Sequence, residues 1–245
     1  MSWYSDDGLW SGFSELMWPQ RLTVEADELV RESPLLAFPS GSQVLDLCCG
    51  PGRFVVPLAR KGYQVTGVDL NAPVLDRAKQ AAADAGVSAE LVQGDMLEFV
   101  RPGGFDVVLN MYTSFGYFDD AEKNLQVLRN AHTSLAPGGK LLLEVYGKEI
   151  VAKNIGRTHA FPQPDGIAYM RHSVLDDWTK LRTDWTLVDG DTARSAHIQS
   201  YIYSAAELRR LFEDAGFTDI EAYGGFDGAP YDKRAKRLIV QGVRA

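Results

Sequence analysis

The chain has 245 residues, of which 45% are hydrophobic and 24% charged, and its formal net charge is −8. This length suffices for one sizeable core, so we expect a single domain with a cap, not two domains. The acidic balance argues against a nucleic-acid partner, which requires clustered cations, and no apolar run reaches the roughly 18 residues of a membrane span.

The first 42 residues combine an aromatic stretch with a helical pattern over residues 20–31. We expect residues 1–42 to form a helical lid segment. No basic region precedes an apolar stretch, so a signal peptide is not expected. The only cysteines, Cys48 and Cys49, are adjacent and lie in an apolar run. They predict a reduced, cytoplasmic protein and neither a disulfide framework nor a metal site.

Apolar runs and helical patterns alternate from residue 43 onward, as in a parallel sheet that helices cover on both faces. Glycines end two of the predicted helices, where they act as stop signals. A Pro-Gly-Gly turn is expected at 137–139, before the fifth strand. The predicted strands are 43–48, 63–69, 89–93, 105–110 and 140–146, and the predicted helices are 53–61, 72–85 and 119–135.

This alternation stops after the fifth strand. Residues 148–203 instead contain stretches with period-two patterning and an Asp189-Gly190 hairpin signal, which predict an antiparallel cap inserted after strand five. The cap is too small to be an independent domain, so residues 1–245 are expected to form one domain. The patterned stretches are 167–175, 181–188 and 192–203.

The remaining elements complete the sheet. A helix over 204–215 begins with a capping box formed by Ser204 and Glu207. Strands over 217–223 and 237–243 form a pair at one edge. The predicted fold class is therefore α/β and Rossmann-like, with a seven-stranded, mostly parallel sheet, helices on both faces and a small antiparallel cap insertion.

The most informative stretch is residues 44–52, Val-Leu-Asp-Leu-Cys-Cys-Gly-Pro-Gly, which predicts a buried strand, a glycine turn and the start of a helix. Seventeen residues past the second glycine, Asp69 ends the next strand. A tight turn without a phosphate-binding lysine, followed by an acidic strand end, indicates a site for a nucleoside with a ribose diol. A dinucleotide fingerprint needs a third glycine, but Val55 occupies that position.

Further segments follow the later strands. They are Gln93-Gly94-Asp95-Met96, the aromatic-rich stretch 110–118, and Leu135-Ala136-Pro137-Gly138-Gly139-Lys140. In this order the segments resemble class I S-adenosylmethionine-dependent methyltransferases, from about residue 20 to the end of the chain. The closing stretch 225–232 and the cap resemble the small-molecule branch of that family. Cys48 departs from the family motif, because it stands where the first glycine is expected.

The resemblance implies S-adenosyl-L-methionine as the cofactor and S-adenosyl-L-homocysteine as the product. Asp69 would accept hydrogen bonds from both ribose hydroxyls, since an ionised carboxylate offers two acceptor oxygens. Gly50 and Gly52 would let the backbone pass close to the cofactor, where a Cβ would intrude. Asp46 would orient the turn and bind a water molecule or the methionine ammonium, because a buried acid requires a partner.

The resemblance also implies roles at the two ends of the cofactor. Asp95 would accept a hydrogen bond from the adenine amino group, and Leu70 and Met96 would pack on the adenine faces. Asn110 would offer its backbone carbonyl to the methionine ammonium. Arg21 would pair with the methionine carboxylate. Met96 in the core and Arg21 at the surface remain the structural alternatives.

Aromatic residues after strand four would line the space in front of the sulfonium methyl group; the candidates are Tyr112, Phe115, Tyr117 and Phe118. Tyr231 resembles a substrate-facing position. Tyr117 and His172 are the candidate catalytic residues. His132, His159 and His197 are further candidate bases, although a lone histidine is more often structural, and ordinary packing remains the alternative for the aromatic residues.

The predicted function is methyl transfer, by in-line displacement, to an amine or hydroxyl group of a small molecule by a monomer or homodimer. The enzyme must align the nucleophile, methyl carbon and sulfur and exclude water. Peptide, protein or RNA methylation and non-catalytic cofactor binding are the alternatives. The sequence after strand four, Asn110-Met111-Tyr112-Thr113, lacks the Asn-Pro-Pro-aromatic pattern, which argues against modification of a nucleobase or glutamine amide.

Overall fold

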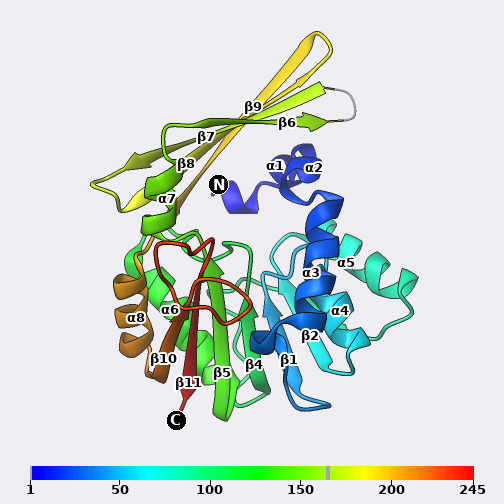
Figure 1. Cartoon of the computed structure of the whole chain (residues 1–245). Coiled ribbons are helices and arrows are strands. Elements are labelled where there is room, and N and C mark those ends of the chain that lie inside the picture. Colours follow the sequence, from blue (N-terminus) through cyan, green and yellow to red (C-terminus); the bar gives the residue numbers. More distant parts are fainter. Residues whose placement is uncertain (1, 164–165) are drawn as a thin grey trace.

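A computed structural model describes residues 2–163 and 166–245. Its main element is a seven-stranded sheet with strand order β10-β11-β5-β4-β1-β2-β3 (Figure 1). Strand β11 runs antiparallel to both neighbours, and the other pairs are parallel. This confirms the predicted α/β class and the edge pair. The strands are β1 (Gln43–Leu47), β2 (Gln64–Asp69), β3 (Glu90–Gln93), β4 (Phe105–Asn110), β5 (Leu135–Val145), β10 (Phe217–Tyr223) and β11 (Leu238–Arg244).

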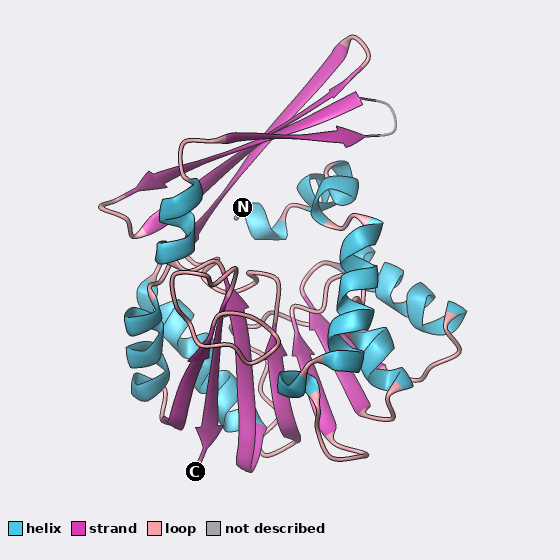
Figure 2. Cartoon of the chain, viewed as in Figure 1, coloured by secondary structure: helices cyan, strands magenta, loops and turns pink. Residues whose placement is uncertain are grey.

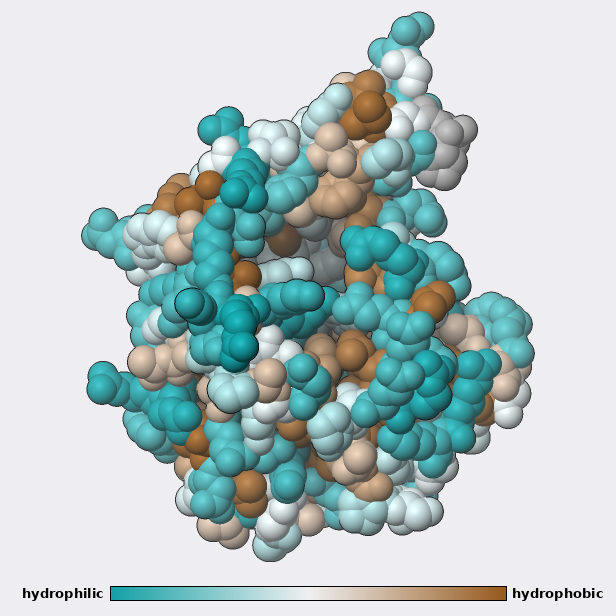
Figure 3. Space-filling view, in the orientation of Figure 1, coloured by the Kyte–Doolittle hydropathy of each residue, from teal (hydrophilic) through white to brown (hydrophobic). Residues whose placement is uncertain are grey.

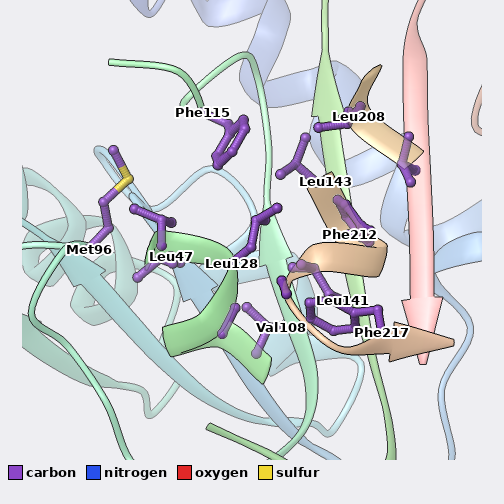
Figure 4. Close-up of a cluster of buried hydrophobic side chains, with 14 of the residues drawn as sticks. Leu47, Met96, Val108, Phe115, Leu128, Leu141, Leu143, Leu208, Phe212 and Phe217 are labelled. Atoms are coloured by element: carbon purple, nitrogen blue, oxygen red, sulfur yellow. The ribbon is translucent and has the colours of Figure 1, made fainter. Parts of the chain in front are cut away.

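Helices cover both faces of this sheet (Figure 2). One face carries α3 (Gln20–Glu32), α4 (Val55–Arg60) and α5 (Ala72–Asp84), and the other carries α6 (Ala121–Ser134) and α8 (Ala205–Asp214). Each face has its own core of buried apolar side chains because every central strand is buried on both sides. Figure 4 shows the core beneath α6 and α8; its members include Leu128, Leu141, Leu143, Leu208 and Phe212.

A second sheet of four antiparallel strands lies beyond the carboxyl ends of the parallel strands (Figure 1). We call it the cap sheet; its strands are β6 (Thr158–Gln163), β7 (Gly166–Leu175), β8 (Lys180–Asp189) and β9 (Thr192–Tyr201). Three of them match the patterned stretches. Strand β6 and the short helix α7 (Lys148–Asn154) were not predicted, since Pro162 interrupts the pattern of β6 and α7 spans only 7 residues.

The N-terminal segment, residues 2–17, lies between the cap sheet and the parallel strand ends (Figure 1). It comprises η1 (Trp3–Ser5), α1 (Asp7–Gly12) and α2 (Ser14–Met17), and η2 (Pro34–Leu36) follows α3. The indole of Trp3 donates to the Gln199 carbonyl at 2.9 Å, and its ring lies 4.6 Å from the Tyr117 ring. Leu9 and Phe13 pack against Trp185 of the cap sheet. The segment therefore contacts both the cap and the loop after β4.

Element boundaries differ from the predictions in a few places. The turn expected at 137–139 lies inside β5, because the pairing with β4 shifts between Phe105↔Leu135 and Val107↔Lys140 and accommodates these residues as an irregularity. The capping box of α8 is confirmed: the Glu207 amide donates to Ser204 Oγ, and the Ser204 amide donates to Glu207 Oε2. In the described part of the chain, the model contains no helix that is both long and apolar enough for a bilayer.

Candidate active site

A cavity, here called the main cavity, lies where the parallel strand ends face the N-terminal segment and the cap sheet. The surface is hollowed between the cap sheet and the body of the molecule (Figure 3). Open parallel sheets bind ligands at this edge. Of the residues predicted for the site, those that line the main cavity are Asp46, Cys48, Gly50, Asp69, Leu70, Asp95, Met96, Tyr112, Tyr117, Phe118 and His172.

The turn after β1 is tied to the end of β2 through Asp69. Its Oδ2 accepts from the Gly50 amide at 2.9 Å and its Oδ1 from the Asn71 amide at 3.0 Å. Gly50 has a φ of 56°, in the left-handed region that favours glycine. Burial raises the pKa of Asp69, and these amides act in the opposite direction. Each carboxylate oxygen has two acceptor positions, so Asp69 can also receive a ligand diol.

Asp46 and Arg53 bring opposite charges to the floor of the main cavity. Asp46 is 2% exposed, and its carboxylate accepts no hydrogen bond from any described residue. Burial raises the pKa of Asp46 to about 7, although Arg53 lowers it. The Arg53 guanidinium likewise lacks a hydrogen-bond or ion-pair partner among the described residues, and burial lowers its pKa. This pair can satisfy the ammonium and the carboxylate of an amino acid.

The opposite end of the main cavity is suited to a flat ring. Asp95 Oδ1 accepts from the Leu97 amide at 2.8 Å, which leaves further acceptor positions on its carboxylate. Met96 is 6% exposed, and its sulfur lies 3.3 Å from Cys48 Sγ. Leu70 and Met96 supply apolar surface. Their places in the structure match the predicted adenine contacts, whose roles stay predictions.

Two aromatic residues of the N-terminal region close the main cavity over the glycine turn. The rings of Trp10 and Trp18 stack at 5.6 Å with an interplanar angle of 16°. A Cβ on Gly50 would lie 3.5 Å from Trp18 Nε1, so the two approach closely. Trp18 and Arg53 were not among the predicted cofactor contacts. Arg53 directly follows the Gly50-Pro51-Gly52 turn, and a cation at that position was the available signal.

Some predicted residues lie outside the main cavity. Gly52 packs against α5, where an added Cβ would lie 3.2 Å from the Ala78 Cβ. Asn110 is 2% exposed, and its amide donates to the Leu47 carbonyl at 3.2 Å. Phe115 is 1% exposed and belongs to the core beneath α6 and α8 (Figure 4).

Tyr231 and Arg21 also lie away from the main cavity. The Tyr231 hydroxyl donates to Glu149 Oε2 at 3.0 Å, and Tyr231 lines neither cavity. Arg21 is exposed and lines an adjoining cavity, which shares Arg53 and Tyr112 with the main cavity. Arg21 therefore lies beside the main cavity and not in it.

The loop after β4 has an unusual backbone. Tyr112 and Thr113 have φ values of 54° and 61°, which are uncommon outside glycine. Their amides donate to the same residue of β5: Tyr112 to Glu144 Oε2 at 2.6 Å, and Thr113 to the Glu144 carbonyl at 3.1 Å. Arg237 pairs with Glu144 at 3.0 Å. Sequence reasoning did not identify Glu144 or Arg237.

The two candidate catalytic residues differ in their titration. Burial and the nearby His159 lower the pKa of His172, so its imidazole is neutral at pH 7 and can accept a proton. Its Nδ1 lies 2.9 Å from Thr183 Oγ1. Burial raises the pKa of Tyr117, so its hydroxyl stays protonated and cannot act as a base near pH 7. His132, by contrast, packs against Phe217 in the body of the protein.

Comparisons with known proteins agree with this geometry. The family described as a methyltransferase domain matches residues 44–139. The chain is 29% identical over 203 residues to a cypemycin N-terminal methyltransferase from Streptomyces sp, covering 82% of each. It is 26% identical over 206 residues to a dTDP-3-amino-3,4,6-trideoxy-alpha-D-glucopyranose N,N-dimethyltransferase from Streptomyces venezuelae, covering 78% of this chain and 81% of the relative. A crystal structure of an S-adenosylmethionine-dependent methyltransferase from Clostridium acetobutylicum ATCC 824 has a TM-score of 0.78 at 15% identity, covering 94% of this chain and 95% of that one.

Proposed function

Because the chain belongs to the class I S-adenosylmethionine-dependent methyltransferases, we propose that it methylates an amine of a small molecule and that the main cavity holds the methyl donor. The observation that carries this proposal is the row of carboxylates at successive strand ends, with the unpaired Asp46 and Arg53 at one end and Leu70 and Met96 at the other. This order matches the two ends of S-adenosylmethionine.

Each part of the donor has a matching group in the main cavity. Asp69 binds the ribose hydroxyls, and Asp95 accepts from the adenine amino group between Leu70 and Met96. Asp46 binds the methionine ammonium, and Arg53 binds the methionine carboxylate. Arg53 suits this role better than the predicted Arg21, because Arg21 is exposed and lines only the adjoining cavity.

When bound, S-adenosylmethionine supplies an electrophilic methyl carbon on its sulfonium sulfur. The chain itself must align the acceptor with that carbon, exclude water and take up a proton. The N-terminal segment and the cap sheet act as the lids that exclude water. His172 takes the proton from an attacking amine, since its imidazole is neutral, whereas Tyr117 only positions the acceptor.

An amine acceptor is preferred for two reasons. The cap side of the main cavity is mostly apolar and includes the indole ring of Trp185, and the face of such a ring attracts a developing ammonium. The other apolar residues on this side are Met170, Leu181, Ile198 and Ile202. Two relatives are also named for methylation of nitrogen. The cypemycin relative makes a peptide N-terminus the second candidate acceptor.

The test combines donor binding with an acceptor screen. Calorimetry should detect binding of S-adenosylmethionine and none of NAD; the reverse result would overturn the assignment of the cavity. A homocysteine-release assay across amines, phenols, sugars and short peptides should then give turnover with amines. Turnover confined to phenols or to RNA would refute the proposed acceptor.

A further inference from the structure

The loop Tyr112–Thr113 forms part of the wall between the two cavities, and its conformation is strained. Two consecutive non-glycine residues have positive φ values, and one of them is a β-branched threonine. Such residues are energetically costly and persist only where their surroundings enforce them. Both residues line both cavities, so their backbone conformation determines the shape of this wall.

One residue enforces this conformation. Glu144 is 0% exposed, and it accepts the Tyr112 amide with its carboxylate and the Thr113 amide with its backbone carbonyl. Its carboxylate also receives Arg237 Nη1 at 3.0 Å. Both carboxylate oxygens are therefore occupied by donors. A neutral amide has one acceptor oxygen and could satisfy only one of these two donors.

The same network extends to helix α3. Arg237 Nη2 donates to Glu25 of that helix at 3.0 Å, and the Tyr112 hydroxyl donates to the Leu22 carbonyl at 3.3 Å. Burial lowers the pKa of Arg237, but Glu144, Tyr146 and Glu25 outweigh it, so the net shift is upward.

The network ends at the methionine side of the main cavity. The guanidinium of Arg53 stacks on the Tyr112 ring, with 4.1 Å between its carbon and the ring centroid. The guanidinium carbon of Arg237 lies 5.3 Å from the same ring centroid. The buried Nη1 of Arg53 has no hydrogen-bond partner within residues 2–163 and 166–245, so the stacking on the Tyr112 ring is the contact through which this loop can position Arg53.

We propose that Glu144 is a positioning residue for methyl-donor binding: its carboxylate holds Tyr112–Thr113 in the left-handed conformation and thereby places Arg53 against the methionine carboxylate. This role rests on the proposed function and deepens it. The adenosine end of the cavity contacts Asp69 and Asp95 instead and does not depend on Glu144.

The test compares two ligands that differ only at the methionine end. S-adenosylhomocysteine carries the amino acid group, whereas 5′-methylthioadenosine lacks it. In Glu144→Gln, calorimetry should show at least a tenfold weaker affinity for S-adenosylhomocysteine and an unchanged affinity for 5′-methylthioadenosine. Glu90→Gln is the matched control, because Glu90 forms an exposed ion pair with Arg101 on the far edge of the sheet and should leave both affinities unchanged.

A second variant distinguishes a positioning role of Glu144 from a general loss of structure in Glu144→Gln. Thr113→Gly, added to Glu144→Gln, should recover part of the lost S-adenosylhomocysteine affinity, because glycine adopts a positive φ without strain. Equal losses for both ligands, or no recovery in the double variant, would show that Glu144 has only a structural role. An unchanged affinity of Glu144→Gln for S-adenosylhomocysteine would also refute the inference. Failure of the wild-type protein to bind S-adenosylhomocysteine would instead refute the proposed function.

Discussion

Replacing Asp46 with asparagine should stabilise the free protein and weaken its binding of the methyl donor. The carboxylate is buried, accepts no hydrogen bond from the described residues, and has a pKa raised from 3.8 to about 7. Burying a charge without a partner is unfavourable, and the ligand ammonium is the partner that the proposed function supplies. Asparagine removes the charge and keeps the shape of the side chain.

The size of the effect follows from the pKa. Each pKa unit corresponds to about 1.4 kcal/mol, so the ionised Asp46 destabilises the folded state by at most about 4 kcal/mol above pH 7. In the folded protein Asp46 takes up a proton as the pH falls below about 7, whereas in the unfolded chain it stays ionised down to about 3.8. The penalty is therefore complete above pH 7 and declines between pH 7 and pH 4. The pKa of about 7 already includes the opposing effect of Arg53, so this figure is a net penalty.

Thermal unfolding at two pH values measures this penalty. For a chain of this size, 1 kcal/mol shifts the melting temperature by about 2–4 °C, so Asp46→Asn should melt up to roughly 8–16 °C higher at pH 8. At pH 5 the gain should fall to roughly a third. The control is Asp214→Asn at the exposed end of α8, which should change neither value.

Donor binding should change in the opposite direction. Asp46→Asn should bind S-adenosylmethionine at least about tenfold more weakly at pH 8, the cost of losing a charge-assisted hydrogen bond. In the wild-type protein the affinity should also weaken as the pH falls from 8 to 6, because Asp46 must lose its proton before it binds an ammonium. A melting shift that is the same at both pH values, or an unchanged donor affinity, would refute this reasoning.

Three further changes test other parts of the site. Asp69→Ala should weaken S-adenosylmethionine binding by about 1–3 kcal/mol in calorimetry, because the ribose hydroxyls and the Gly50 amide lose their acceptor, and an unchanged affinity would contradict the ribose role. His172→Gln should lower kcat with an amine acceptor and, at saturating donor, remove the acidic limb of the kcat–pH profile. In the wild-type protein that limb should lie below pH 6.5, because burial lowers the pKa of His172, and kcat is lost as the pH falls through it. Trp3→Ala should speed amide hydrogen exchange across residues 2–17, because the bond to Gln199 and the contact with Tyr117 are lost, and unaltered exchange would show that other contacts hold this segment.

The sheet could be predicted from sequence because its central strands are buried on both faces and therefore form near-continuous apolar runs. Strand β4 was predicted over the residues it occupies, and the capping box of α8 was predicted with both of its bonds. The cap was predicted less well. Strand β6 lies at the edge of the cap sheet, and its pairing with β7 provides the backbone hydrogen bonds that its own sequence pattern does not indicate.

The candidate site, like the fold, was predicted only in part. Residues at strand ends, such as Asp46, Asp69 and Asp95, were predicted because the order of parallel strands fixes their positions. For the loop after β4, the sequence did not show which aromatic residues face the cavity and which belong to the core. Phe115 packs in the core, whereas Tyr117, two positions later, lines the cavity.

Arg53 and Glu144 could not be identified as site residues from sequence patterns. The importance of Arg53 depends on its buried Nη1, which lacks a hydrogen-bond partner among the described residues, and that is a property of the packed structure and not of any motif. Glu144 lies within the apolar strand β5, so the sequence indicates a buried acid but not the groups that donate hydrogen bonds to it. Its donors come from residues 112 and 237, which are distant in sequence and meet only because β4 and β11 flank β5. The polar residues that line the cavity can therefore be predicted from the order of the strands. The residues that fix the shape of the cavity, such as Glu144, can be identified only once the pairing of the strands is known.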